Sequence, residues 1–172
     1  SGKRVIAGGP GNPPVVVDED ADLDLAARSI IEGAAFDNNL LCIGEKEVFV
    51  VERVADDFIT AMARAGAVKL DAPAIKKLTE AAFTFDGPGK GCGRAHVKRD
   101  LLGQDAGTLA EAAGVRVPAG TVMLFGETAA FHPFVQEEQM MPFLPIIRVP
   151  DFAAGVAAAV QAEHGYRHTA IV

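Results

Sequence analysis

The sequence predicts an α/β protein in which a mainly parallel sheet is flanked by helices. Short apolar runs of strand length alternate along the chain with segments whose apolar residues recur at helical spacing. Strands that alternate with helices favour parallel pairing, because each crossover places a helix on one face of the sheet. The chain has 172 residues, of which 49% are hydrophobic, so we expect one domain with a substantial core.

The first two elements are predicted near the amino terminus. The run "PPVVVDED" holds three valines bounded by prolines and acids, which indicates a short buried strand. A helix follows, with Asp20 as the expected N-cap and with one apolar face. We expect this helix to end at "DNN", so that Cys42 lies within the next turn. The apolar face consists of Leu23, Ala27, Ile30, Ile31 and Ala34.

The later elements continue the alternation. Strands are expected in "EVFVVE", "TVMLFGE" and "PFLPIIRV", and helices in "VADDFITAMARAG", "DAPAIKKLTEAAF", "GQDAGTLAEAAG" and "DFAAGVAAAVQAEHG". Gly66 and Gly114 are expected to end the first and third of these helices, and Pro73 lies early in the second, where its missing N–H costs nothing. Cys42 thus lies between a helix and the following strand, whereas ligands of such sheets gather beyond the carboxyl ends of the strands.

Charge and composition argue against several classes of protein. The net charge of −7 argues against a protein that binds the phosphate backbone of nucleic acid. Two cysteines far apart in sequence do not form a disulfide framework, which favours a reducing cytoplasm. No apolar run approaches the roughly 18 residues of a membrane span, and no signal peptide is recognisable. We therefore predict a cytoplasmic protein without nucleic-acid or membrane partners.

The two ends of the sequence lead us to expect a fragment. The sequence has no initiating methionine, and "SGKRVIAGG" opens almost at once into a strand-like piece. At the other end, "HTAIV" stops where a further strand would begin. We therefore expect that parts needed for function lie outside residues 1–172.

Several other motifs have a plain structural explanation. The glycine-rich run "GPGKGCGR" has no strand before it and no Lys-Ser/Thr after it, so we expect a surface loop in which Cys92 is a bystander. Glu137 and Glu138 are expected in one solvated helical turn before a strand, and His132 is expected to be a capped loop histidine. No metal site is predicted, because metal-ligand spacing is lacking among His96, His132, His164 and His168.

Cys42 alone supports two interpretations, and a wider resemblance favours one of them. A free cysteine is often buried and inert, but this one follows small and amide residues and precedes a strand, as a nucleophile on a turn would. With Glu138, it belongs to a set of stretches that resembles the catalytic domain of the aldehyde dehydrogenase superfamily. These stretches are "GGPGNPPVVVDEDADL", "GAAFDNNLLCIGEKEVFVV", "LGQDAGTLAEAAGVRVP", "ETAAFHPFVQEEQMMPFLPIIRV" and "GYRHTA".

The resemblance is closest to the CoA-acylating branch, the propionaldehyde and acetaldehyde dehydrogenases of bacterial microcompartments. It implies that residues 1–172 are the cysteine-bearing catalytic domain, truncated, and that the cofactor-binding domain of the same chain is absent. It also implies a homo-oligomeric parent enzyme that acts on a small-molecule aldehyde. The truncated chain alone is then expected to be inactive.

The resemblance implies a mechanism and a set of site residues. Cys42 is the nucleophile that attacks the aldehyde; hydride passes to NAD, and the acyl group that remains as a thioester on Cys42 is transferred to coenzyme A, which frees the Cys42 thiol. The backbone N–H of Cys42 and an amide of the cofactor domain hold the oxyanion. Glu138 binds the nicotinamide ribose and Met140 packs near the nicotinamide. Gly8 and Gly9 are expected on the cofactor side of the site.

The choice of CoA over water rests on one departure from the pattern. Hydrolytic members place a general-base Glu two residues before the Gly pair, where this chain has Ile6. His132, in "HPF", matches a position of the acylating branch, and both His132 and Asn39 are expected on the substrate or CoA side of the site. Asn38 and Asn39 are also expected to shape the turn that presents Cys42. Two alternatives stay open: a hydrolytic dehydrogenase that gives a free acid, and a fragment that acts only as an assembly domain.

Overall fold

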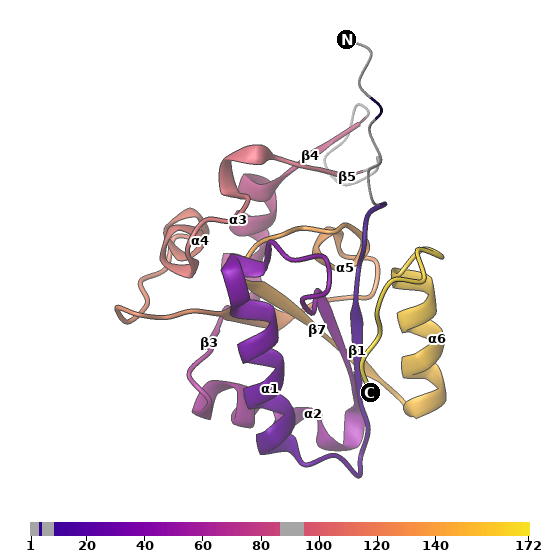
Figure 1. Ribbon diagram of the computed structural model, residues 1–172. Helices are drawn as coiled ribbons and strands as arrows, with labels where there is room; N and C mark the ends of the chain where they lie inside the picture. Colours follow the sequence, from indigo (N-terminus) through magenta and orange to yellow (C-terminus); the bar gives the residue numbers. More distant parts are fainter. Residues whose placement is uncertain (1–3, 5–8, 87–94) are drawn as a thin grey trace.

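Five strands form one parallel sheet in the order β1-β2-β7-β6-β3 (Figure 1). The computed structural model describes residue 4, residues 9–86 and residues 95–172. Neighbouring strands of this sheet all run parallel, which confirms the predicted fold class. The strands are β1 (Pro14–Val17), β2 (Glu47–Val51), β3 (Val68–Lys69), β6 (Leu124–Glu127) and β7 (Phe143–Val149).

Helices cover both faces of the sheet. Because side chains alternate along a strand, Val15 and Val17 of β1 pack with α1 and α2, whereas Val16 packs with α6. Figure 1 shows α6 on the opposite side of β1 from α1. Within the described residues, no helix is long and apolar enough to cross a bilayer. The helices are α1 (Leu23–Ala35), α2 (Glu52–Arg64), α3 (Ala72–Ala82), α4 (Ala106–Ala113), α5 (Pro133–Gln136) and α6 (Phe152–Ala162), with 3₁₀ helices η1 (Phe36–Asn39) and η2 (Arg99–Leu101).

The N-cap of α1 is Asp22, so the prediction of Asp20 is wrong. The Oδ1 atom of Asp22 accepts a hydrogen bond from the N–H of Leu25 at 3.0 Å. Only the residue directly before the first helical turn can place its carboxylate over the free N–H groups, and the helix begins at Leu23. The predicted apolar face is confirmed, with burial of Ala27, Ile30, Ile31 and Ala34.

The prediction of a helical turn at Glu137 and Glu138 is also wrong, because the turn occurs earlier in the chain, in α5. His132 lies between β6 and β7, as predicted, and is itself the N-cap of α5: its Nδ1 accepts from the N–H of Phe134 at 3.3 Å. The backbone is already extended at Glu137. The sequence analysis also did not predict the two-residue strand β3 or the antiparallel pair of β4 (Phe83–Phe85) and β5 (Ala95–Val97). The glycine-rich run with Cys92 lies outside the described residues.

The amino ends of the parallel strands share one edge of the sheet, which we call the amino edge. It is formed by segments 10–13, 39–46 and 137–142, which directly precede β1, β2 and β7. Ile171 pairs beside β1, since its N–H donates to the Pro14 carbonyl and its own carbonyl accepts from the Val16 N–H, both at 3.0 Å. The segment before Ile171 therefore approaches the amino edge as well.

Candidate functional site

Cys42 lies on an exposed turn at the amino edge. The turn runs from Leu41 to Gly44 and is closed by a hydrogen bond of 3.1 Å from the Gly44 N–H to the Leu41 carbonyl. The free thiol of Cys42 is exposed, and so are the side chains of Leu41 and Ile43 on either side of it. The structure therefore excludes the interpretation of Cys42 as an inert core thiol and supports the interpretation of Cys42 as a thiol presented on a turn.

Three successive residues before this turn adopt left-handed backbone conformations. Asp37, Asn38 and Asn39 have φ angles of 49°, 52° and 65°. Asp and Asn tolerate this region better than other residues with a side chain, because their short polar groups bond locally. Here the Asn39 amide donates to the carbonyls of Ala34 at 2.8 Å and Glu45 at 2.9 Å. These bonds hold the chain in the shape that leads to Cys42.

Asn38 ties the same segment to a second loop. Its amide donates to the carbonyl of Gly103 and to the carboxylate of Asp105, both at 2.9 Å. The N–H of Gly103 in turn donates to the carbonyl of Met140 at 3.0 Å. The residues expected to shape the Cys42 turn are thus bonded as a group to the loop that precedes β7.

A fully buried lysine lies beneath the turn. The ammonium of Lys46 donates to the Asn39 carbonyl at 2.7 Å, to the Asn39 side-chain oxygen, and to the Leu41 carbonyl at 3.1 Å. Its three hydrogens therefore have three acceptors. Burial lowers the pKa of Lys46 to about 8, against the opposing effect of nearby negative groups, of which Glu138 is the strongest. Lys46 is thus mainly charged at neutral pH.

Gln139 joins the Glu138 segment to this cluster. The buried amide of Gln139 donates to the carbonyls of Lys46 at 3.3 Å and Phe143 at 3.2 Å, and its oxygen accepts from the Met141 N–H at 2.9 Å. Glu138 and Met140, on either side of Gln139, are half-buried. The structure therefore brings four predicted site residues to one edge: Cys42, Asn39, Glu138 and Met140.

Gly11 and His168 also belong to this edge, and the sequence patterns missed both. A Cβ atom on Gly11 would lie 2.9 Å from the Cys42 carbonyl oxygen and 3.2 Å from Cγ of the His168 ring. The imidazole of His168 therefore packs close to the Cys42 turn, although the two residues lie far apart in the sequence. Gly9 is exposed with open space around its Cα, and Gly8 lies outside the described residues.

A buried carboxyl group completes the surroundings of Lys46. Glu47 has no exposed surface, and burial raises its pKa well above the usual value, against the pull of the neighbouring Lys46 charge. One of its oxygens accepts from the Asn12 amide at 3.4 Å, and the other lacks a partner among the described residues. Burial therefore favours the protonated form of Glu47, at the start of β2. The only sign of this cluster in the sequence was the pair of charged residues that opens the apolar run of β2.

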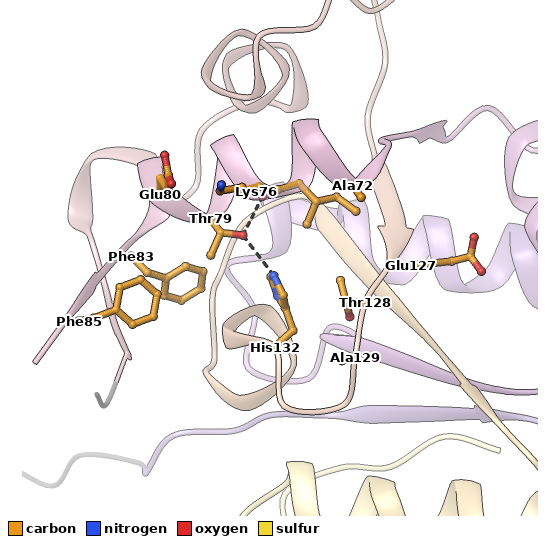
Figure 2. Close-up of a pocket in the computed structure, with 11 residues that line it drawn as sticks. Ala72, Lys76, Thr79, Glu80, Phe83, Phe85, Glu127, Thr128, Ala129 and His132 are labelled. Carbon is orange, nitrogen blue, oxygen red and sulfur yellow. Dashed lines mark hydrogen bonds between the residues drawn. The ribbon is translucent and has the colours of Figure 1, made fainter. Parts of the chain in front are cut away.

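His132 lies apart from this group, in a cavity of about 520 Å³ (Figure 2). Its Nε2 lies 3.3 Å from the Thr79 hydroxyl, and burial lowers its pKa to about 4, so the ring is neutral. Figure 2 shows the ring pointing toward Thr79 on α3. The cavity is lined by residues of α3, of β4 and of segment 127–132. The structure therefore does not bring His132 together with Cys42.

The described residues contain no group of three or more His, Cys, Asp or Glu side chains placed to hold a metal ion. The chemistry of the amino edge is that of a thiol, an ammonium, carboxylates and an imidazole.

Comparison with known proteins agrees with this geometry. Residues 1–81 match the aldehyde dehydrogenase family. The chain is 50% identical over 169 residues to the acetaldehyde dehydrogenase (acetylating) EutE of Escherichia coli K12, which aligns with 98% of this chain and 35% of that protein. A propionaldehyde dehydrogenase from the fucose utilisation microcompartment of Clostridium phytofermentans superposes with a TM-score of 0.86 at 40% identity, over 98% of this chain and 37% of that chain. A Rhodopseudomonas palustris propionaldehyde dehydrogenase with bound CoA and an acylated cysteine superposes with a TM-score of 0.87 at 38% identity, over 98% of this chain and 37% of that chain.

The parallel sheet, the cysteine turn and these matches point to one class: the chain is similar to aldehyde dehydrogenases, and the model of that family matches residues 1–81. More particularly, its relatives include acylating acetaldehyde and propionaldehyde dehydrogenases, as the sequence motifs indicated. The chain spans about 35% of the length of the curated relative that it matches.

Proposed function

We propose that the protein to which this chain belongs is an NAD-dependent, CoA-acylating aldehyde dehydrogenase. Its substrates are short-chain aldehydes such as propionaldehyde or acetaldehyde, and its product is the acyl-CoA. The observation that supports this most is the exposed Cys42 thiol, tied through Lys46 and Gln139 to the segment of Glu138. Because the chain spans about 35% of its relative, the activity is proposed for a protein that also contains a cofactor-binding domain.

Cys42 is the proposed nucleophile. Its thiolate attacks the aldehyde carbon, and the carbonyl electron pair moves to oxygen, where the backbone N–H of Cys42 stabilises the developing charge. Hydride departure leaves an acyl-thioester on Cys42. NAD, when bound, accepts that hydride. The thiolate of CoA then attacks the thioester carbon, and the Cys42 thiolate leaves as the acyl-CoA forms.

Glu138 and Met140 are the proposed contacts to the cofactor. The Glu138 carboxylate is half-buried at the amino edge and accepts no hydrogen bond from the described part of the chain, so it is available to the hydroxyl groups of a ribose. Met140 lies two residues further on and is half-buried, which suits an apolar contact with a nicotinamide ring. The residues present therefore fit the cofactor. Gly8 and Gly9 stay proposed on the same side.

His168 is the proposed base for the CoA thiol. Its ring packs beside Gly11 close to the Cys42 carbonyl, and it is exposed, so an incoming thiol can reach it. A neutral imidazole accepts a proton near neutral pH and would convert the thiol to the attacking thiolate. A CoA-side role for His132 stays a prediction, and it would have to act from the cavity beside α3.

The experiment that tests the proposal measures NADH formation from propionaldehyde by the complete protein, with and without CoA, and identifies the product by mass. We expect turnover to require CoA, to yield propionyl-CoA and to vanish in Cys42→Ala. Formation of propionate at the same rate without CoA would favour the hydrolytic alternative. The 172-residue chain alone is expected to form no NADH, as an isolated catalytic domain would.

We further propose a cytoplasmic homo-oligomer that works inside a bacterial microcompartment. One similar structure comes from a microcompartment enzyme, which supports this placement. Co-sedimentation of the complete protein with purified microcompartments tests it, and recovery of all activity in the soluble fraction would contradict it.

A further inference from the structure

Lys46 is placed to control the peptide unit between Leu41 and Cys42. This unit holds two groups, the carbonyl of Leu41 and the N–H of Cys42, which point in opposite directions in a planar trans peptide. The Leu41 carbonyl points inward, because it accepts from the buried Lys46 ammonium at 3.1 Å. The Cys42 N–H must therefore point away from Lys46.

The Cys42 N–H is free to bind an anion. Among the described residues, no group accepts a hydrogen bond from it, whereas the Gly44 N–H of the same turn is bonded at 3.1 Å. An unbonded N–H beside an exposed thiol is the donor that an oxyanion formed at that thiol needs. The Cys42 N–H can stabilise an oxyanion only in this orientation of the peptide. If the peptide were rotated, it would present the Leu41 carbonyl, which repels an anion.

The turn's own hydrogen bond fixes this peptide relative to Gly44 but not relative to the core. The side chains of Leu41 and Ile43 are exposed, so apolar packing contributes little to the orientation of the peptide between Leu41 and Cys42. Lys46 supplies the missing anchor, because one ammonium binds both the Asn39 carbonyl before the turn and the Leu41 carbonyl within it. Gln139 in turn binds the Lys46 carbonyl at 3.3 Å and fixes the backbone from which the ammonium extends.

We propose that Lys46 is a positioning residue that locks the Leu41–Cys42 peptide so that the Cys42 N–H faces the site as an oxyanion donor. The inference rests on the proposed role of Cys42 as nucleophile. It assigns to Lys46 no contact with substrate and no proton transfer.

Two reagents separate this role from a merely structural one. Acylation of Cys42 by p-nitrophenyl acetate passes through an oxyanion: the thiolate attacks the ester carbon, and p-nitrophenolate leaves as the C–O bond breaks. Alkylation by iodoacetamide forms an S–C bond with loss of iodide and no oxyanion. Loss of the Lys46 charge or a shift of the thiol affects both rates, so it largely cancels in their ratio. Rotation of the peptide lowers the acylation rate alone.

The test uses the 172-residue chain with Cys92→Ser, which leaves Cys42 as the sole cysteine. In Lys46→Met we expect the ratio of acylation to alkylation rates to fall roughly tenfold or more, towards the 10²–10³-fold that loss of one oxyanion donor costs. Lys69→Met is the matched control, since it removes an exposed lysine paired with Glu127 at the far edge of the sheet. There we expect the ratio to change less than about twofold.

The outcomes are distinct. An unchanged ratio in Lys46→Met would show that the turn's own hydrogen bond suffices and would overturn the inference. An equal fall of both rates would overturn it as well. Failure of the unsubstituted Lys46 chain to be acylated, while iodoacetamide still alkylates it, would instead count against Cys42 as the nucleophile of the proposed function.

A measurement without a Lys46 variant guards against misfolding. Amide hydrogen exchange of the chain should show the Cys42 N–H unprotected and the Gly44 N–H protected. A Cys42 amide as protected as that of Gly44 would mean that the peptide faces inward and would overturn the proposal. If Lys46→Met loses its far-ultraviolet circular dichroism, Lys46→Gln replaces it in the same pair of reactions with the same expected fall.

Discussion

Gln139 and Lys46 are joined across the amino edge by a single buried contact, in which the Gln139 amide donates to the Lys46 carbonyl at 3.3 Å. Through this contact the segment that precedes β7 supports the residue that supports the Cys42 turn. Gln139 also bonds the Phe143 carbonyl and the Met141 N–H, so one side chain satisfies three backbone groups. Both parts of the proposed site, the nucleophile and the cofactor contacts, therefore depend on one amide.

Replacement of Gln139 by Leu should destabilise the chain by about 2–4 kcal/mol, because it leaves buried backbone groups without partners. Urea unfolding followed by circular dichroism measures the loss. Gln161→Leu, on the exposed face of α6, is the control and should change the free energy of unfolding by less than about 0.5 kcal/mol. A Gln139→Leu chain as stable as the control would contradict the supporting role of this amide.

Gly11→Ala should impair Cys42 more than it impairs folding. The added Cβ would lie 2.9 Å from the Cys42 carbonyl oxygen, a backbone atom that moves only if the turn moves. Since small misplacements of reacting groups cost up to about 10²-fold, we expect at least a tenfold loss of p-nitrophenyl acetate acylation. Gly9→Ala is the control, because the space around Gly9 is open. Equal acylation rates for both variants would mean that the Cys42 turn can move to accommodate the added Cβ without loss of reactivity, which would contradict the prediction.

The raised pKa of Glu47 predicts that the free energy of unfolding falls as the pH rises. Its pKa is raised in the folded chain, so above about pH 4.5 the unfolded state loses a proton that the folded state keeps. The Glu47 contribution to stability is therefore fully present below that pH and is lost by up to about 1.4 kcal/mol per pH unit as the pH rises toward the folded pKa.

Glu47→Gln, which mimics the neutral acid, should remove this loss. Urea unfolding of the variant and of the unsubstituted chain between pH 4 and pH 6.5 measures this. The range ends more than one pH unit below the pKa of Lys46, which is about 8. The gap between the two stability curves should widen as the pH rises. Glu32→Gln on the exposed face of α1 should give a constant gap, and parallel curves for Glu47→Gln would show that the carboxyl is ionised in the fold.

The two histidines should differ in their effect on acyl transfer. In the complete protein, His168→Gln should lower the CoA-dependent step by roughly 10²-fold, within the range of general base catalysis, because its ring packs close to the Cys42 turn. His132→Gln should lower it less than about threefold, because that ring lies in the cavity beside α3. Stopped-flow transfer from the acylated enzyme to CoA measures both. A larger loss in His132→Gln would return the CoA-side role to that residue.

Local patterns predicted the elements whose signals are local. The apolar face of α1 follows from helical spacing, and the ends of α2 and α4 follow from Gly66 and Gly114, which take φ angles of 100° and 75°. The choice between Asp20 and Asp22 as N-cap could not be made, because both acids precede the same helix and only the geometry of its first turn decides. β3 has two residues and therefore shows no period.

The polar cluster beneath Cys42 could not be predicted for a different reason. Lys46 and Glu47 open an apolar strand, where a charged pair usually marks a solvated strand end. Their burial is made possible by Gln139 and Asn12, which lie far away in the sequence and arrive only when the parallel strands assemble. The nucleophile and the ribose-binding acid were expected from family resemblance, and the cluster that supports them appears only in three dimensions.

The enclosure of Lys46 has a practical consequence for chemical labelling of this protein. An amine with a pKa near 8 would ordinarily react first with an activated ester dye at neutral pH, because more of it is unprotonated. Lys46 has no exposed surface, whereas Lys69, Lys76 and Lys77 are exposed. Dye attachment or surface immobilisation through amines will therefore modify the outer lysines and leave the cysteine turn intact, so the thiol can still be assayed on the labelled protein.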